Sequence, residues 1–355
     1  MQDMNSEAMT PRERWMATLS RQKPDRVPMD YWATPEVDQM LLRHCRCENI
    51  WDSFKQLHID RPVVVSPAYV GPSRPPGAND FGVIYKKVDY GTGAYDEALF
   101  HPLAQFQSIA ELEAKYVWPR PDWYDYRCLV SQLVGKEEYP VEGPWSEPFY
   151  IYKDLRGMEQ SFADLAENPE FAHYCLEKLF DYEYQRVLRT FEALPGKVTD
   201  ILVGEDLGTQ DDLMYSLRHI REYFLPRMKK MMKLVHDGGA FVMTHSDGAV
   251  RKVIPDLIEI GMDVLNPTQW RCTGMDREGL KRDFGNKIIF HGAMDNQQTL
   301  PFGSAEEVRQ EVLDNLRILG TGGGYILAPC HNLQAITPVE NILAMYETGY
   351  RAGRW

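Results

Sequence analysis

A histidine and an aspartate at the end of one apolar run are the residues of this sequence best suited to chemistry. The run is Ala240-Phe-Val-Met-Thr, and it continues into His245-Ser-Asp-Gly248. Aromatic and β-branched residues of this kind favour a strand. Imidazole and carboxylate groups bind metal ions and transfer protons. The run therefore predicts a strand whose end presents either metal ligands or an acid–base pair.

Polar residues end several other strand-like runs along the chain. At the carboxyl-end rim of a parallel barrel, such residues converge from distant parts of the sequence. Acids, imidazoles and a thiol together suit a metal site or acid–base catalysis. The candidates are Asp30, Tyr31, Glu142, Glu205, Asp206, His245, Asp247, Asn266, Gln269, His291, Asp295, Cys330 and His331.

Ordinary structural roles compete with the functional ones. Asp247 is equally suited to capping the helix that follows it, and Cys330 to filling a buried apolar position. His331 could simply brace a turn. Glu205 and Asp206 are adjacent, so on a strand they face opposite sides, and at most one points into the rim unless the chain turns between them.

The elements that must position these residues alternate between strands and helices. Helices are predicted between most of the strands, among them residues 151–167, 220–237 and 250–260. This alternation predicts an α/β fold, a (β/α)8 barrel of the TIM type. An open doubly wound sheet is the alternative, but no Gly-x-Gly-x-x-Gly or Walker loop follows any strand. The predicted strands are residues 26–32, 58–66, 139–145, 199–209, 240–245, 263–269, 287–295 and 322–331.

Two additions to the barrel are expected within a single domain of residues 1–355. An N-terminal helix within residues 1–24 begins with the capping signature Thr10-Pro-Arg-Glu13. Residues 68–102 read as an insertion that holds a β-hairpin at about residues 81–97. An insertion of this length after a barrel strand suggests a lid over the mouth.

Composition excludes several classes of partner. The chain has 355 residues and a formal net charge of −13, which argues against binding nucleic acid or an anionic membrane surface. No apolar stretch approaches the ~18 residues needed to cross a bilayer. The acidic start lacks the basic and apolar run of a secretory leader. We therefore expect a cytoplasmic protein whose six cysteines are free thiols.

Five motifs resemble those of the uroporphyrinogen decarboxylase superfamily, mostly from about residue 200 to the C-terminus. The opening Pro11-Arg-Glu-Arg14 and Pro24-Asp-Arg-Val-Pro28 fit the same resemblance. The combination is specific for the superfamily and much less so for one reaction. The motifs are His245-Ser-Asp-Gly248, Gly261-Met-Asp-Val-Leu-Asn-Pro267, Phe290-His-Gly-Ala-Met-Asp295, Leu300-Pro-Phe-Gly303 and Gly323-Gly-Tyr-Ile-Leu-Ala-Pro-Cys-His-Asn332.

The resemblance implies one of two reactions. Members that decarboxylate porphyrinogens hold substrate carboxylates with arginines after the first strand, where this chain has Asp30-Tyr-Trp-Ala-Thr-Pro35. Members that transfer methyl groups to or from corrinoid proteins typically bind zinc through His-x-Cys and a later Cys. His245 and Cys330 match that pattern, whereas Asp247 replaces the first Cys. A carboxylate makes the site harder, which favours an oxygen substrate such as a methyl ether.

The resemblance therefore favours a methyltransferase that acts on a small substrate and on a corrinoid (cobalamin) carried by a partner protein. Its zinc would be held by His245, Cys330 and an acid, Asp247 or Glu205, and Glu205 or Asp206 could supply a further ligand; a homodimer is the assembly considered. The alternatives are a metal-free decarboxylase of a small acid and a non-catalytic protein that binds a tetrapyrrole or a partner. The remaining expected roles are catalytic for His291, His331, Asp30 and Tyr31, and cofactor-binding for Asn266, Gln269 and Asp295.

Overall fold

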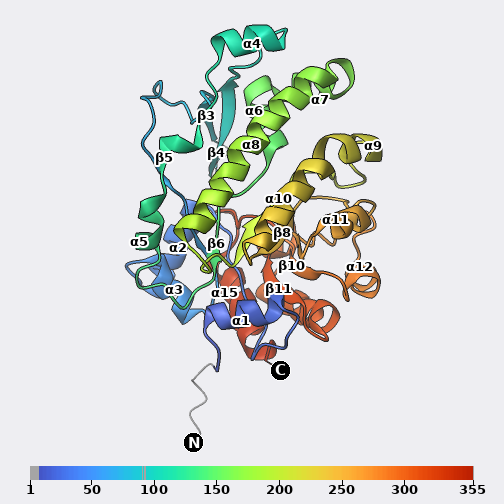
Figure 1. Cartoon of the computed structure of the whole chain (residues 1–355). Helices are drawn as coiled ribbons and strands as arrows, with labels where there is room; N and C mark the ends of the chain where they lie inside the picture. The colour runs from blue at the N-terminus through green and yellow to red at the C-terminus, as the bar shows by residue number, and fades with distance from the viewer. Residues whose placement is uncertain (1–7, 90, 92, 355) are drawn as a thin grey trace, which may run out of the picture.

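Seven parallel strands form one curved sheet in the computed structural model, which describes residues 8–89, 91 and 93–354 (Figure 1). Their order in the sheet follows the chain, β1-β6-β7-β8-β9-β10-β11. The strands are short, and their residues are almost all buried because helices cover the outside. Their bounds are β1 Val63–Val64, β6 Val141–Glu142, β7 Asp200–Leu202, β8 Phe241–His245, β9 Val264–Asn266, β10 Ile289–Met294 and β11 Tyr325–Pro329.

Residues 26–33 close the sheet into a barrel between β11 and β1. Met29 pairs with Leu327 in a parallel bridge, and the Asp30 N–H donates to the Leu327 carbonyl at 2.9 Å. On the other side, the Asp60 N–H donates to the Met29 carbonyl at 2.7 Å. Pro28 has no N–H to give, which limits this segment to single bridges. The predicted eight-stranded barrel is confirmed.

Helices lie outside and between the strands, and some boundaries differ from those expected. The predicted helix over 151–167 is two helices, because Gly157 takes a φ of 89° between them. Among the described residues, no helix is both long and apolar enough to cross a membrane. The helices of seven residues or more are α1 Pro11–Leu19, α2 Pro35–Cys45, α3 Ile50–Gln56, α4 Ile109–Lys115, α6 Pro148–Arg156, α7 Met158–Glu167, α8 Pro169–Ala193, α10 Leu225–Asp237, α11 Ile254–Ile260, α12 Arg277–Phe284, α14 Ala305–Asn315 and α15 Val339–Ala352.

Short helical turns complete several of these elements. The predicted helix over 220–237 begins with a π-helical turn before α10, and α14 ends in another. Helix α11 begins only at Ile254, four residues later than expected. The short elements are η1 Pro121–Trp123, η2 Tyr126–Cys128, α5 Leu129–Gln132, α9 Leu217–His219, η3 Ile220–Phe224, α13 Thr299–Phe302 and η4 Leu316–Gly320.

Helix α1 closes the amino-terminal end of the barrel. The predicted capping box is present: the Glu13 N–H donates to Thr10 Oγ1, and the Thr10 N–H donates to Glu13 Oε2 at 2.8 Å. Arg12 and Arg21 donate to carbonyls just before β7 and β10. Trp15 is fully buried and packs in the barrel interior with Leu19, Trp32, Leu202, Met243, Val264, Ile289 and Ile326.

Buried ion pairs hold this end together. Asp60, which precedes β1, accepts from Arg14 Nη1 at 2.6 Å and from Arg26 Nη1 at 2.7 Å. Arg14 Nε also donates to Asp25 at 2.7 Å. Although burial acts to raise it, the pKa of Asp25 is lowered by the Arg14 hydrogen bond and charge. Asp25 and Asp60 therefore each face at least one arginine.

The predicted hairpin is present at the opposite end from α1 (Figure 1). Strands β3 Ile84–Asp89 and β4 Ala94–Phe100 pair antiparallel, and the Tyr85 hydroxyl donates to Asp154 of α6 at 2.6 Å. The 68–102 insertion also contains β2 Ala68–Tyr69, which pairs with β5 Tyr124–Asp125. Large apolar side chains of β4 remain exposed, with Leu99 at 62% of its area.

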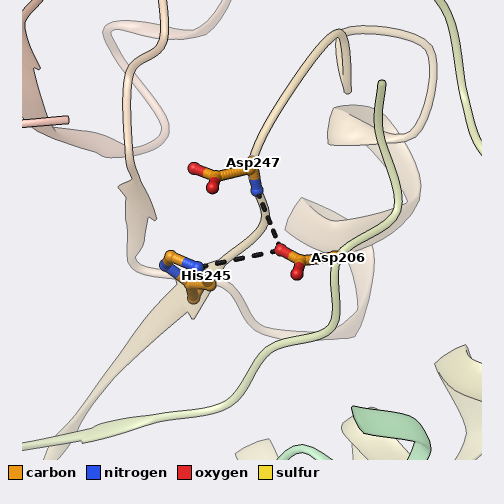
Figure 2. Close-up of side chains that lie close together, drawn as sticks. All are labelled: Asp206, His245 and Asp247. Atoms are coloured by element: carbon orange, nitrogen blue, oxygen red, sulfur yellow. Dashed lines mark hydrogen bonds and ion pairs between the residues drawn. The ribbon is translucent and has the colours of Figure 1, made fainter. Parts of the chain in front are cut away.

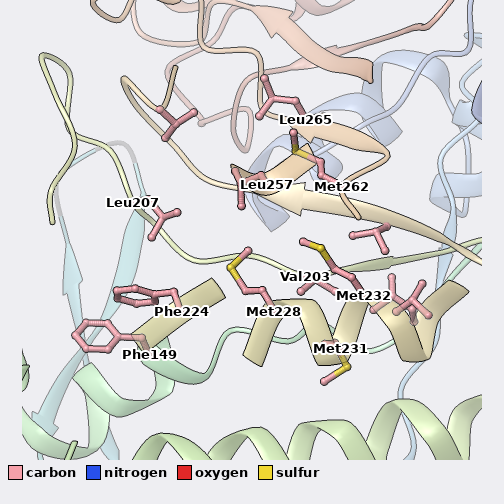
Figure 3. Packing of buried hydrophobic residues seen from close by; sticks show 14 of the residues in the cluster. Phe149, Val203, Leu207, Phe224, Met228, Met231, Met232, Leu257, Met262 and Leu265 are labelled. Atoms are coloured by element: carbon pink, nitrogen blue, oxygen red, sulfur yellow. The ribbon is translucent and has the colours of Figure 1, made fainter. Parts of the chain in front are cut away.

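Methionines form much of the packing between α10 and the barrel. Figure 3 shows Met228, Met231 and Met232 on α10, with Val203 beyond β7 and Leu257 of α11 in the same cluster. All three methionine side chains are buried. Flexible thioether side chains fill such irregular gaps well. This packing fixes β7 and β8, whose ends carry the candidate site.

Candidate metal centre at the barrel mouth

Asp206, His245 and Asp247 lie together at the mouth (Figure 2). Each offers one ligand atom, and these three atoms lie within 4.8 Å of one another. His245 Nε2 is 3.8 Å from Asp206 Oδ1, to which the Asp247 N–H also donates at 3.4 Å. His245 ends β8 and Asp206 follows β7, and the two strands pair in parallel. Their ends therefore meet at one rim.

A hydrogen-bonded chain fixes the His245 ring. Its Nδ1 lies 2.6 Å from Asn266 Oδ1, while Asn266 Nδ2 lies 2.6 Å from His291 Nδ1. His291 Nε2 lies 2.9 Å from Asp30 Oδ2. Because an amide oxygen only accepts, His245 Nδ1 carries a proton and donates it. In the neutral ring, Nε2 then keeps its lone pair and faces Asp206, as a metal ligand must.

Close backbone contacts hold the loop after β8. Gly248 has a φ of 90°, and a Cβ there would lie 2.5 Å from the Thr209 carbonyl oxygen. The Gly248 N–H donates to Gln269 Oε1 at 2.8 Å, and the Leu207 N–H donates to Ser246 Oγ at 2.9 Å. Only glycine fits at position 248, because any side chain there would collide with the Thr209 carbonyl oxygen. Gln269, predicted to bind a cofactor, thus braces the loop that carries Asp247.

Asp206, and not the predicted Glu205, is the acid beside His245. Glu205 is buried, and its two carboxylate oxygens accept from the Phe149 and Tyr150 N–H groups at 2.6 and 3.1 Å. Burial holds the pKa of Glu205 well above its usual range. Adjacent residues in extended chain face opposite ways, so Glu205 caps α6 while Asp206 points into the mouth.

The same alternation separates Asp30 from Tyr31. Asp30 faces His291, and although its burial acts to raise the pKa of Asp30, the His291 hydrogen bond lowers it. The Tyr31 hydroxyl donates instead to Asp38 of α2 at 2.7 Å, and its ring packs on Phe54. Tyr31, predicted as catalytic, therefore lies in the core and not with the metal group.

Cys330, predicted as a metal ligand, is buried and lies outside the three-residue group. Its thiol donates to the Thr268 carbonyl oxygen at 3.5 Å. Burial, followed by the charges of Glu311, Asp295 and Asp247, raises the pKa of Cys330 well above its usual range. A metal ion would have to displace the thiol proton and the bond to Thr268 before Cys330 could bind it as a thiolate.

Asp295 and His331 occupy different surroundings. Asp295, predicted to bind a cofactor, accepts from Arg271 Nε at 2.6 Å and from the Thr299 N–H at 3.1 Å, so it fixes the start of α13. His331 is exposed at the mouth. Burial raises the pKa of Asp247, and the charges of His245 and His331 oppose that rise. Of these two predicted residues, His331 lies near the metal group.

Two tryptophans and an arginine were missed among the candidates. Trp32 stacks near-parallel on His245, with 6.0 Å between ring centroids, and on Trp145 at 5.7 Å. Arg61 lines a small pocket with Trp32, Trp145 and Glu142. Trp32 follows Asp30 by two residues, a spacing that returns to the same side of a strand. That spacing could have identified Trp32 from the sequence. Nothing in the sequence indicates that Arg61, which precedes β1, reaches the mouth.

The three-residue group suits zinc. Imidazole nitrogen and carboxylate oxygens are ordinary zinc ligands, and three protein ligands leave one position open for a substrate. The ring orientation already imposed by Asn266 is the arrangement that metal-binding histidines require. The types of donor atom therefore suit zinc, and the contact with Asn266 already orients His245 toward the other two residues.

The family model described as uroporphyrinogen decarboxylase (URO-D) matches residues 140–351. A uroporphyrinogen decarboxylase of Pseudoalteromonas translucida is 23% identical over 93% of this chain and 94% of its own length. The methylcobamide:CoM methyltransferase MtaA of Methanosarcina barkeri is 22% identical over 61% of this chain and 59% of its own length.

A solved structure has the same fold. It is a methyltransferase from Methanosarcina mazei, with a TM-score of 0.71 and 16% sequence identity over 97% of this chain and 99% of its own. This likeness supports the barrel architecture. The named relatives thus represent both of the reactions that the family resemblance implied, decarboxylation and methyl transfer.

Proposed function

The chain belongs to the uroporphyrinogen decarboxylase (URO-D) family, and we propose that it is a methyltransferase of that family. It would move a methyl group between a small substrate and the cobalt of a corrinoid protein. The observation that carries the proposal is the Asp206–His245–Asp247 group at the mouth. A relative named for methyl transfer from a methylcobamide supports the same reaction.

A zinc ion held by His245, Asp206 and Asp247 would act as a Lewis acid on the substrate heteroatom. Asn266 keeps His245 Nε2 directed at the site, and His291 with Asp30 holds Asn266 in turn. Two carboxylates make this a harder site than one with thiolates, so an oxygen leaving group fits it best. The substrate class is therefore a methyl ether.

The leaving oxygen requires a proton as the methyl group departs. His331 is exposed at the mouth, and its charge acts to lower the pKa of Asp247. It therefore lies near the metal group, and we propose it as the proton donor. His291 is fully buried and engaged on both ring nitrogens, so we assign it a positioning role. Cys330 would join the metal only after losing its proton and its bond to Thr268.

The partner corrinoid protein would approach the mouth beside the β3–β4 hairpin. Tyr95, Leu99 and Phe100 of β4 are about half exposed or more, and they give that hairpin an apolar edge. Exposed apolar side chains of this kind mark contact surfaces. We assign the hairpin to docking or covering the partner.

The test is methylation of a reduced corrinoid carrier, followed by the change in its visible spectrum. Zinc-loaded protein is offered methyl ethers, methyl thiols and methylamines in turn. We expect donor-dependent methylation with an ether, abolished in His245→Ala and retained in His236→Ala, a partly exposed histidine that bonds Asp263. No methylation with any donor or carrier would overturn the proposal.

A decarboxylase of a small acid is the second candidate. Glu142 favours it: its burial raises the pKa of Glu142 to about 7, so this group can donate a proton near neutral pH. The near full-length relative is also named as a decarboxylase. Carbon dioxide release that survives removal of metal, without methyl transfer, would select this candidate.

A further inference from the structure

Arg61 is half-buried, and one nitrogen of its guanidinium has no partner in the described part of the chain. Its Nη1 is enclosed, and no hydrogen bond or ion pair satisfies it there. A buried arginine nitrogen without an acceptor is costly, and most such groups in proteins are paired. The guanidinium lines a pocket at the mouth that also includes Asp30, Trp32, Glu142, Trp145 and Asn332.

The nearby carboxylates bond to other groups. Asp30 Oδ1 accepts from the Tyr31 N–H at 2.7 Å, and Oδ2 accepts from Trp32 Nε1 at 2.8 Å. His291 Nε2 donates to the same Oδ2. Glu142 Oε1 accepts from Trp145 Nε1 at 2.5 Å. Asp30, Glu142 and Asp38 of α2 all lie close enough to interact with the charge of Arg61, but none of them accepts a hydrogen bond from its Nη1.

One side of the pocket is a pair of stacked indoles. Trp32 and Trp145 lie 22° from parallel with 5.7 Å between their centroids, and 42% of Trp145 is exposed. The cavity itself measures about 50 Å³ and opens to solvent, so a ligand would lie only partly enclosed against these side chains. Trp32 also stacks on His245, so one indole borders both the pocket and the metal group.

We propose that this pocket binds the carboxylate of an aromatic substrate, with Arg61 as the carboxylate anchor and the exposed indole of Trp145, which Trp32 backs, as the surface that contacts the ring. Guanidinium presents parallel N–H groups that match a carboxylate. Indole faces favour an aromatic ring over an aliphatic one. The inference rests on the proposed function, and names its substrate as a methyl ether of an aromatic acid.

The test is binding of benzoate to metal-free protein by calorimetry, which needs neither zinc nor methyl transfer. We expect benzoate to bind more tightly than cyclohexanecarboxylate. Arg61→Met should raise the benzoate Kd by about tenfold or more. Arg282→Met, which removes an arginine that is 71% exposed on α12, should leave the benzoate Kd unchanged.

Three results would overturn the assignment: no benzoate binding at millimolar concentration, equal Kd values in wild type and Arg61→Met, or equal binding of cyclohexanecarboxylate. Should Arg61→Met fail to fold, a wild-type crystal soaked in 4-iodobenzoate gives the answer. Its carboxylate must lie within hydrogen-bond distance of Arg61, and any other position contradicts the proposal. Benzoate binding without methyl transfer would refute the proposed function alone.

Discussion

Acidic residues at the two ends of the barrel have different partners. At the amino-terminal end, Asp60 is completely buried between Arg14 and Arg26, and Asp25 also bonds Arg14. At the mouth, Asp206 and Asp247 share their surroundings with a histidine, and no arginine or lysine forms an ion pair with them among the described residues. Arginines thus neutralise Asp25 and Asp60, whereas Asp206 and Asp247 remain available to a cation.

The difference separates structural from functional acids. A carboxylate paired with arginine is satisfied and has little left to offer a ligand. Unpaired acids cost stability: burial raises the pKa of Asp247 and of Glu142. Groups kept in that state at a cleft are candidates for a functional site. A bound cation would supply at the mouth the positive charge that arginines supply at the other end.

The largest effect is expected from breaking the paired end. Asp60→Ala removes four accepted hydrogen bonds, including one from the Met29 N–H at 2.9 Å, and leaves Arg14 and Arg26 charged and buried. The free energy of unfolding should fall by about 3–5 kcal/mol. Urea unfolding measures it.

The matched control is Asp212→Ala, which breaks an exposed ion pair with Lys252. That change should lower the free energy of unfolding far less than Asp60→Ala does, because solvent screens the exposed pair. Equal losses in the two variants would show that burial of the Asp60 pairs carries no special weight.

A pH effect is expected from Glu183 of α8, which lies fully buried behind the mouth. Burial raises the pKa of Glu183 from 4.5 to about 8. The folded state therefore holds this proton more tightly than the unfolded state. The contribution is complete below pH 4.5 and is lost as the pH rises to about 8. Glu183→Gln, which carries no such proton, should remove this loss.

The expected size is on the order of 3 kcal/mol of unfolding free energy between about pH 5 and 8. Urea unfolding at several pH values measures it, with Glu192→Gln as an exposed control on the same helix. If the free energy of unfolding of Glu183→Gln falls with pH as steeply as that of the wild type, groups other than Glu183 cause the pH dependence.

A smaller effect on free energy, confined to the site, is expected from Asn266→Ala. This change removes the acceptor for His245 Nδ1 and the donor to His291. Loss of such an orienting partner usually weakens metal binding by about 10–100-fold. Zinc competition with a chelating dye measures it, and Gln297→Ala at an exposed position serves as control. An unchanged zinc affinity would mean that Asn266 does not orient His245.

The sequence predicted the architecture better than the side-chain directions. Strand runs and caps located the barrel, α1 and the β3–β4 hairpin, since apolar periodicity and capping are local properties. Single residues at strand ends were harder. Asp206 and Glu205, like Asp30 and Tyr31, differ by one position, and only the pleat of the built strand decides which faces the mouth.

Long-range contacts explain the other differences. Arg61 reaches the mouth from before β1, and nothing near it in sequence shows that its Nη1 has no acceptor there. Asp295 was placed correctly at a strand end, but Arg271, from a separate loop, bonds to it. Such pairings depend on how the barrel brings loops together.

The zinc content of the purified, zinc-dialysed protein tests the central claim most directly. Elemental analysis should give about one zinc per chain in the wild type, because the chain has one such group of three ligands among its described residues and a catalytic zinc site needs three ligands and an open position. His245→Ala and Asp206→Ala should lose it, whereas Glu205→Gln, at the acid that caps α6, should keep it. A wild type without zinc, or zinc retained in folded His245→Ala, would contradict a metal centre at the barrel mouth.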